Sequence, residues 1–286
     1  MPRLARLSST GMARTSCPRC GGTGWVTVAA SSARAGAAPQ TQAVRCECTA
    51  ADRDARLLER ARIPHRYEHC DFENFDTALY EGQPGGAAWD RSLEQARLVV
   101  QGFARDFPAG TEHGLLLLGS CGAGKTHLAV AALKEIAARG HNAIFYDYRE
   151  LLKEIQHSYN PETQASEMDV LEPVLACELL LLDDLGSSKP SLWALETVGH
   201  ILNSRYNEKR LTLLTTNFLD REESRRTPPS RSLALSSGEN VRAGEDSLAD
   251  RVGQRIRSRL YEMCRTVEIA APDFRKEVRQ AGRARG

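Results

Sequence analysis

Apolar residues along the chain gather in five short runs that are separated by longer amphipathic or polar stretches. Runs of this length, rich in Leu, Val, Ile and Thr and bounded by polar residues, are typical of strands buried on both faces of a sheet. We expect five such strands, at residues 115–118, 142–147, 179–182, 211–217 and 265–270. Strands that alternate with helical patterns predict an α/β fold, with a parallel five-stranded sheet between helices.

The stretches between these runs carry apolar residues at helical spacing. A charged helical pattern over residues 52–69 stops at Ile63-Pro64, because the residue before a proline disfavours helix. Residues 221–247 are polar, contain Pro and Gly and have no period, which predicts a long loop. The other predicted helices lie at residues 92–103, 128–133, 149–157, 191–206 and 247–261, the last with Ser247 as its N-cap.

A glycine-rich loop joins the first of these strands to the helix that follows it. Its G-x-x-x-x-G-K-[ST] spacing between a strand and a helix is typical of a P-loop, in which backbone N–H groups bind phosphates. The lysine is expected to reach the β- and γ-phosphates of ATP, and the threonine hydroxyl to bind Mg²⁺. The alternative is an ordinary glycine turn, which the correct flanking elements disfavour. The predicted nucleotide-binding residues are Gly119, Ser120, Cys121, Gly122, Ala123, Gly124, Lys125, Thr126 and His127.

Two carboxylates end the four-leucine run at residues 179–182. In an open parallel sheet the carboxyl ends of strands meet at one edge, so these groups are expected beside the P-loop as a Walker B pair. We expect Asp183 to hold Mg²⁺ opposite Thr126, and Asp184 to orient or deprotonate the attacking water. A solvated acidic turn is the alternative for this motif taken alone. As a catalytic base, Asp184 is one methylene shorter than a glutamate would be, which is consistent with slow hydrolysis.

Four cysteines form two close pairs near the start of the chain. Cys17 and Cys20 lie on a C-P-x-C-G-G knuckle, and Cys46 and Cys48 make the second pair. Four thiolates are the ligand set of a structural Zn²⁺, which would supply the folding energy that so small a segment lacks. The alternative is four free thiols in an unstructured tail.

Charge and hydropathy bear on the binding partners and on the cellular compartment of the protein. Residues 1–50 hold six Arg and one acidic residue, and residues from Arg251 onward hold ten Arg or Lys and four acidic residues. Basic ends on a nearly neutral chain suggest contact with nucleic acid or with an acidic protein, although solvated ends without a partner explain the charge equally well. No apolar run reaches membrane-spanning length, and the first residues lack a secretory pattern, so we expect a cytoplasmic protein.

Three arginines recur four residues apart within the helix predicted at 247–261. Arg251, Arg255 and Arg259 would stack on one face and repel one another unless an anionic group faces them. A solvated basic face is the simpler explanation. An anionic group that faces the row is the more specific explanation.

Two stretches flanking the P-loop resemble the DnaC/DnaI-type helicase loaders, which are AAA+ ATPases of the IstB/DnaC-like ATP-binding family. They are ARIPHRYEHCDFENF at 61–75 and LADRVGQRIRSRLYEMC at 248–264. The resemblance implies that Asn217 is the sensor 1 residue and that Arg255 or Arg259 is an arginine finger for a neighbouring subunit. It also implies that Arg275 lies in a sensor 2 segment, although the spacing there is one residue shorter than in the family. The short stretch after Pro272 leads us to expect no C-terminal helical lid.

The resemblance implies three parts: a zinc module at residues 1–50, a linker with a lead-in helix at 51–90, and an AAA+ ATPase domain at 91–286. It implies an ATPase that uses ATP, Mg²⁺ and a structural Zn²⁺ and loads a replicative DnaB-type helicase onto single-stranded DNA. Self-association through AAA+ subunit interfaces is expected as well. Two alternatives remain open, namely an IstB-type transposition helper and an adaptor that is switched by ATP without hydrolysing it.

Overall fold

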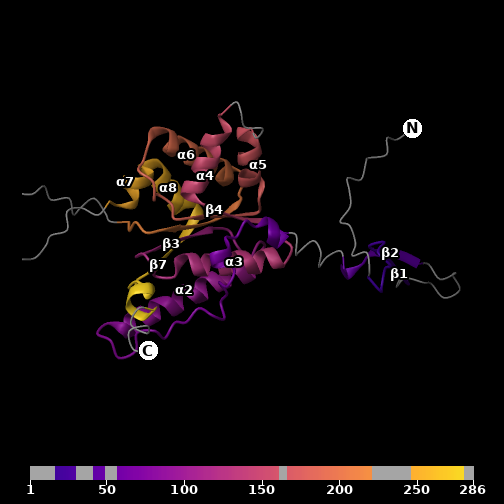
Figure 1. Cartoon of the computed structure of the whole chain (residues 1–286), viewed down its shortest axis with the longest axis horizontal. Helices are drawn as coiled ribbons and strands as arrows, with labels where there is room; N and C mark the ends of the chain where they lie inside the picture. The colour runs from indigo at the N-terminus through magenta and orange to yellow at the C-terminus, as the bar shows by residue number, and fades with distance from the viewer. Residues whose placement is uncertain (1–16, 30–40, 49–56, 161–165, 221–245, 280–286) are drawn as a thin grey trace, which may run out of the picture.

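The computed structural model describes residues 17–29, 41–48, 57–160, 166–220 and 246–279 (Figure 1). The predicted five-stranded parallel sheet is confirmed. Its strands are β3 (Gly114–Gly119), β4 (Ala143–Asp147), β5 (Leu179–Asp183), β6 (Leu211–Thr216) and β7 (Cys264–Ile269). They lie in the order β4-β5-β6-β3-β7 and every neighbouring pair is parallel. The carboxyl ends of all five strands therefore share one edge, next to the loop that follows β3.

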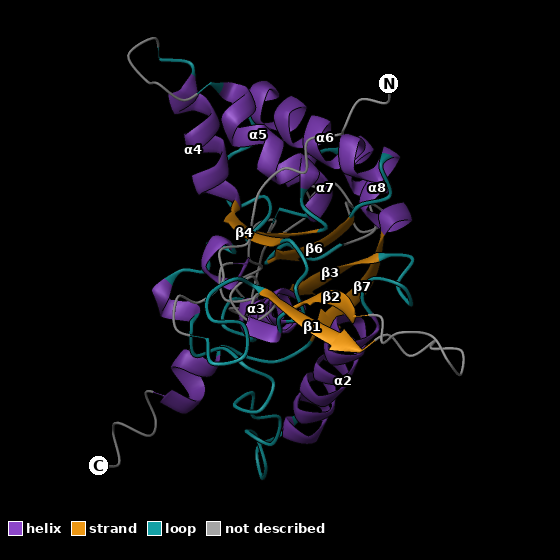
Figure 2. Ribbon diagram, turned by 90° about the vertical axis from the view of Figure 1, so that its right-hand side faces the viewer, coloured by secondary structure: helices purple, strands orange, loops and turns teal. Residues whose placement is uncertain are grey.

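Helices cover both faces of this sheet (Figure 2). On one side lie α2 and α3, and on the other lie α4, α5, α6, α7 and α8. The bounds are α2 (Gly86–Asp106), α3 (Lys125–Ala138), α4 (Tyr148–Ser158), α5 (Glu167–Ala176), α6 (Leu192–Asn207), α7 (Leu248–Val252) and α8 (Gln254–Met263).

The two layers explain why the strands are continuously apolar. Successive residues of a strand point to opposite faces of the sheet. Leu115 and Leu117 accordingly belong to the hydrophobic core beneath α2 and α3, whereas Leu116 and Leu118 belong to the core beneath the other helices. All six residues of β3 are buried.

The described segment before α2, residues 57–85, is called the lead-in. It differs from the helix predicted over residues 52–69. Of that range, residues 52–56 lie outside the described residues, residues 57–60 are helical, and η1 (His65–Tyr67) is a short 3₁₀ helix after Pro64. Residues between 61 and 80 contribute Ala61, Phe72 and Tyr80 to the same core as α3. The following helix, α2, crosses the boundary predicted at residue 90.

Helix α5 was not predicted. It begins at a capping box in which Ser166 and Asp169 bond each other's backbone N–H groups, and it contains Pro173. A proline usually argues against helix, but in a short helix the i−4 carbonyl that it leaves unbonded lies near the first turn.

The single helix predicted at residues 247–261 was wrong. The chain breaks at Gly253, whose φ of 81° and ψ of 152° separate α7 from α8. A left-handed φ is accessible to glycine at little cost, and a helix cannot continue through it. The predicted row of Arg251, Arg255 and Arg259 is therefore divided between two helices.

The described N-terminal residues form a hairpin in which β1 (Trp25–Ala29) pairs antiparallel with β2 (Thr41–Arg45). A final π-helical segment, η3 (Arg275–Arg279), follows β7. Most of the predicted loop at 221–247 lies outside the described residues. Within the described part of the chain, no helix is both long enough and apolar enough to cross a membrane.

Candidate functional site

A cavity of about 820 Å³ lies at the carboxyl edge of the sheet. Its floor is the predicted P-loop and the ends of β4, β5 and β6. Its outer walls come from the lead-in, through residues such as Tyr67 and Phe75, and from Phe274 and Arg275 after β7. The volume falls in the range of small-molecule and cofactor sites.

Two glycines of the P-loop have backbone angles and close neighbouring atoms that disfavour any larger residue. Gly122 has a φ of 76°, and a Cβ there would lie 1.8 Å from Asp273 Oδ1. Gly124 has a φ of 94°, and a Cβ there would lie 2.7 Å from Cε2 of Phe75. Side chains are excluded from this path on both grounds, which leaves a backbone cradle at the start of α3 of the kind that binds phosphate.

Lys125 begins α3 and is 5% exposed. Its Nζ donates to the carbonyl oxygens of Gly119 at 3.0 Å and Ser120 at 2.8 Å, and to Oδ1 of Asn217 at 2.7 Å. Burial lowers the pKa of Lys125, and the nearby Asp183 and Asp184 act in the opposite direction. An anion bound by the backbone cradle would also stabilise the buried positive charge of Lys125.

Thr126 and Asp183 meet across the sheet edge, as expected of a magnesium site. Thr126 Oγ1 donates to Asp183 Oδ1 at 2.9 Å, and Thr215 Oγ1 donates to the same oxygen at 2.6 Å. Burial raises the pKa of Asp183, although both hydroxyl donors oppose the shift. Carboxylate and hydroxyl oxygens at a phosphate site are ligands that suit Mg²⁺.

Asp184 adopts a left-handed backbone with a φ of 58°. Its N–H donates to Thr215 Oγ1 at 2.9 Å, and its Oδ1 accepts from Asn217 Nδ2 at 2.6 Å. A non-glycine residue in this conformation is strained and is often found where a side chain has to be aimed. The chain of contacts from Lys125 through Asn217 to Asp184 links the P-loop to two neighbouring strands.

His127 lies on the wall of the same cavity, but its contacts are with the lead-in. Its Nε2 is 2.9 Å from the Asp71 carbonyl oxygen and 2.9 Å from Asn74 Oδ1. Two turns further along α3, Lys134 Nζ donates to Asp71 Oδ1 at 2.6 Å and to the carbonyl oxygens of Glu68 and Cys70. The lead-in is thereby attached to the helix that carries the P-loop.

The predicted arginines divide into two groups. Arg275 lines the cavity, and its backbone N–H donates to Asp273 Oδ1 at 3.0 Å. Arg255 and Arg259 are not among the residues that line it. The guanidinium of Arg259 lies 4.3 Å from the ring centre of Tyr206 and 4.0 Å from Glu262, whereas Arg255 is exposed and makes no ion pair with another described residue.

Sequence reasoning missed several residues of this cavity. Asp147 ends β4 in register with Asp183 and lines the cavity, while its Oδ1 also caps α4 through the N–H groups of Arg149 and Glu150. Its position at a strand end, like that of Asp183, was the available signal. Tyr67 ends η1 and Phe75 comes from a loop of the lead-in, and no local pattern places them beside the P-loop.

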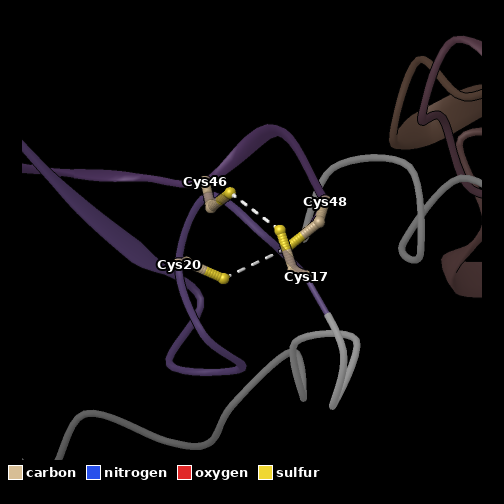
Figure 3. Close-up of side chains that lie close together, drawn as sticks. All are labelled: Cys17, Cys20, Cys46 and Cys48. Atoms are coloured by element: carbon tan, nitrogen blue, oxygen red, sulfur yellow. Dashed lines mark hydrogen bonds between the residues drawn. The ribbon is translucent and has the colours of Figure 1, made fainter.

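The four N-terminal cysteines point toward one another from the knuckle and from the end of the hairpin (Figure 3). The Sγ atoms of Cys17 and Cys46 are 3.8 Å apart, and those of Cys20 and Cys48 are 3.6 Å apart. Tetrahedral zinc with bonds of 2.3 Å would place neighbouring sulfurs about 3.8 Å apart, so the thiols fit such an ion. Hydrogen bonds from the backbone N–H groups of Cys20 and Arg19 lower the pKa of Cys17, whereas burial raises the pKa of Cys48 to about 12.

Comparisons with known proteins agree with this geometry. The chain is 26% identical over 162 residues to the replicative helicase loader DnaC of Escherichia coli, which covers 57% of this chain and 61% of that protein. It is also 26% identical over 131 residues to the helicase loader DnaI of Bacillus subtilis, covering 44% of this chain and 41% of that protein. The chain thus spans about three fifths or less of these relatives' lengths.

Solved structures share the fold. The crystal structure of the DnaC helicase loader matches 72% of this chain and 99% of its own, with a TM-score of 0.53 and 29% identity. The AMPPCP-bound DnaA of Aquifex aeolicus matches 78% of this chain and 56% of its own, with a TM-score of 0.51 and 19% identity, which supports the AAA+ fold alone.

A family model described as IstB-like ATP binding protein matches residues 47–223, which is more than half of the chain and includes the P-loop, Asp183, Asp184 and Asn217. The chain therefore belongs to the IstB/DnaC family of ATP-binding proteins.

Proposed function

We propose that this protein is an ATPase that loads a replicative DNA helicase onto single-stranded DNA. The observation that carries the proposal is the meeting of Lys125, Asp183 and Asp184 at one buried sheet edge. It occurs in a chain whose relatives DnaC and DnaI are replicative helicase loaders. The site supports ATP binding, and the relatives support the choice of partner.

Each residue of the site has a distinct role in this proposal. Bound ATP would supply the phosphoryl group, and Mg²⁺ would neutralise the negative charge of its phosphates. The Nζ of Lys125 would exchange its carbonyl acceptors for phosphate oxygens. Thr126 and Asp183 would hold the magnesium ion, and Asp184 would orient the attacking water and accept its proton, with Asn217 positioning Asp184.

A neighbouring subunit would complete the site. The cavity is walled by this chain's own P-loop and lead-in, and the predicted fingers are not part of its wall. We assign the finger role to Arg255, because Arg259 is already held against Tyr206 and Glu262. An exposed guanidinium without an ion pair among the described residues is free to face a phosphate of a neighbouring copy.

The Cys₄ hairpin would be a zinc module that grips the helicase. The sulfur spacing supports the metal, and the basic N-terminal segment supports contact with an acidic partner surface. Positive charge and backbone contacts would hold single-stranded DNA in the assembled ATPase without reading its bases. We place this activity in the cytoplasm, where helicase and template meet.

Two alternatives keep specific support. The matching family model is named for IstB-like proteins, so a transposition helper with the same ATPase core is the second candidate. A non-hydrolysing adaptor is the third, supported by the short Asp184 in the position of the base. The transposition helper differs from the loader in its partner protein, and the adaptor differs in that it does not hydrolyse ATP.

The partner is tested by capture and loading. The tagged full-length chain is incubated with the organism's replicative helicase and circular single-stranded DNA, with or without ATP, and helicase on the DNA is counted after gel filtration. We expect ATP-dependent loading that Lys125→Ala abolishes and Lys153→Ala leaves unchanged, because the Lys153 side chain is 69% exposed and its ion pair among the described residues is with Glu150 alone. Absence of helicase on the DNA, together with capture of a transposase, would assign the transposition role instead.

A further inference from the structure

A second cluster of metal-ligating side chains lies beside the P-loop. His69 and Cys70 are consecutive residues of the lead-in, and His127 directly follows Thr126 in the first turn of α3. One ligand atom from each of the three lies within 4.8 Å of the others. His69 Nε2 and Cys70 Sγ are 4.0 Å apart, and the two imidazole rings meet edge to face with centres 6.1 Å apart.

The contacts of His127 fix which of its nitrogens carries the proton. Asn74 Nδ2 donates to the carbonyl oxygen of His69, so its Oδ1 is the atom that faces His127 and the Asp71 N–H. With Asn74 Oδ1 and the Asp71 carbonyl oxygen both accepting, Nε2 of His127 is the donor and Nδ1 keeps a lone pair. A histidine that ligates a metal through one nitrogen commonly donates its other N–H to a carbonyl oxygen in this way.

The donor set and the spacing suit a particular class of ion. One thiolate and two imidazoles are ligands of Zn²⁺, with bonds of about 2.3 Å to sulfur and 2.0 Å to nitrogen. Those bonds place a nitrogen and a sulfur about 3.5 Å apart in a tetrahedron. The observed 4.0 Å between His69 and Cys70 is close to that value, and the exposed His69 side chain is free to turn inward.

The surroundings are compatible with an added cation. Cys70 is 2% exposed, and two cationic residues act on it: Lys134, whose Nζ is paired with Asp71 at 2.6 Å, and Arg66, whose guanidinium lies 4.7 Å from the ring centre of Tyr67. All three ligand residues line the nucleotide cavity, so a fourth coordination position would open toward it. This arrangement resembles catalytic or regulatory zinc sites more than closed structural ones.

We propose that His69, Cys70 and His127 form a second site for a Zn²⁺-type transition metal, separate from the Cys₄ hairpin. On binding, the Cys70 thiol releases its proton to solvent and the ion joins the lead-in to α3. This proposal does not depend on the identity of the helicase or on hydrolysis.

The test is a metal titration of the full-length chain. Protein stripped with chelator under reducing conditions is titrated with Co²⁺, following the thiolate charge-transfer and d–d absorption bands, and bound Zn²⁺ is counted by elemental analysis in parallel. We expect two ions per chain, one with a four-sulfur spectrum and one with a mixed nitrogen and sulfur spectrum. Cys17→Ser with Cys20→Ser removes the first ion, and Cys70→Ser removes the second.

His69→Gln covers the case in which Cys70→Ser does not fold, because His69 is exposed. We expect it to weaken the second site at least about tenfold while leaving the first unchanged. His200→Gln, which changes an exposed histidine of α6 outside both clusters, serves as the matched control. One ion per chain that disappears with Cys17→Ser and Cys20→Ser would overturn the proposal, and so would a second ion that survives both Cys70→Ser and His69→Gln.

Discussion

Asn217 accepts a hydrogen bond from Lys125 Nζ at 2.7 Å, although the two residues are 92 positions apart in the chain. The same amide donates to Asp184 at 2.6 Å. The two carbonyl acceptors of Lys125 and this amide use all three of its N–H donors. Nucleotide binding therefore has to exchange at least one of these contacts, and the position of Asn217 depends on what Lys125 binds.

Asn217→Ala tests whether this amide acts in turnover. We expect ATP hydrolysis to fall by about tenfold or more, because Asp184 loses the donor that orients it, while nucleotide affinity changes much less. Steady-state hydrolysis and equilibrium binding of a fluorescent ATP analogue measure the two effects. Asn203→Ala, on the exposed side of α6, is the control. Equal hydrolysis by Asn217→Ala and wild type would remove Asn217 from the mechanism.

Asp183→Asn separates stability from function. Because burial raises the pKa of Asp183 in the fold, its ionised form at neutral pH destabilises the metal-free protein. This cost first develops as the pH rises above about 3.9, the pKa of an unfolded aspartate, and is complete once the pH exceeds the raised folded value. We expect Asp183→Asn to increase the Tm of the metal-free protein near neutral pH and to lose Mg²⁺-dependent nucleotide binding.

The same measurements at several pH values provide the check. The gain in Tm is expected to shrink as the pH falls toward 4, since wild-type Asp183 is then protonated in both states. A neutral-pH Tm that decreases in Asp183→Asn would show that the hydroxyl contacts from Thr126 and Thr215 require the charge.

Much of this site could be predicted because its motifs are local. Gly119–Thr126, Asp183-Asp184 and Asn217 each end a strand, and strands of a parallel sheet bring their ends together. The contact of Phe75 with Gly124 joins segments 49 positions apart, and nothing in either segment indicates the other. The break at Gly253 was also hidden, because Leu248, Val252, Ile256 and Leu260 keep the same spacing through it and all four are buried.

Arg257 lies on α8, the helix that begins after the break at Gly253, and it has a structural role. Its guanidinium binds Asp220 through two parallel contacts of 2.6 and 2.7 Å, with side chains only 28% and 14% exposed. The hydrogen bonds of Arg257 lower the pKa of Asp220, so this stabilisation is present above the ordinary aspartate pKa and is lost as the pH falls through the lower folded value.

Asp220→Asn is therefore expected to destabilise the protein by about 1 to 3 kcal/mol at pH 7. Denaturant unfolding measures the change, and the difference from wild type should narrow only in strong acid. Glu150→Gln, which removes an exposed partner of Lys153, is the control and should change stability by less than about 0.5 kcal/mol. A loss at Asp220 no greater than that would show that the pair contributes nothing beyond an exposed one.

Removing the metal of the hairpin tests the proposed grip on the helicase. The described residues of the hairpin bury little besides the cysteines and Val26, so without an ion we expect the hairpin to unfold while the sheet domain stays folded. Cys17→Ser with Cys20→Ser should abolish helicase capture and leave ATP binding intact. Helicase capture by that double variant would place the grip outside the hairpin.

The most direct test of the central claim is ATP turnover by the full-length chain with Mg²⁺, single-stranded DNA and the replicative helicase. It is measured beside Lys125→Ala and Asp184→Asn under identical conditions. We predict that wild type hydrolyses ATP above the Lys125→Ala background and faster with both partners present, and that Asp184→Asn binds ATP without turning it over. Tight ATP binding by wild type with hydrolysis no greater than that of Lys125→Ala would contradict the account and leave an adaptor that ATP switches without being consumed.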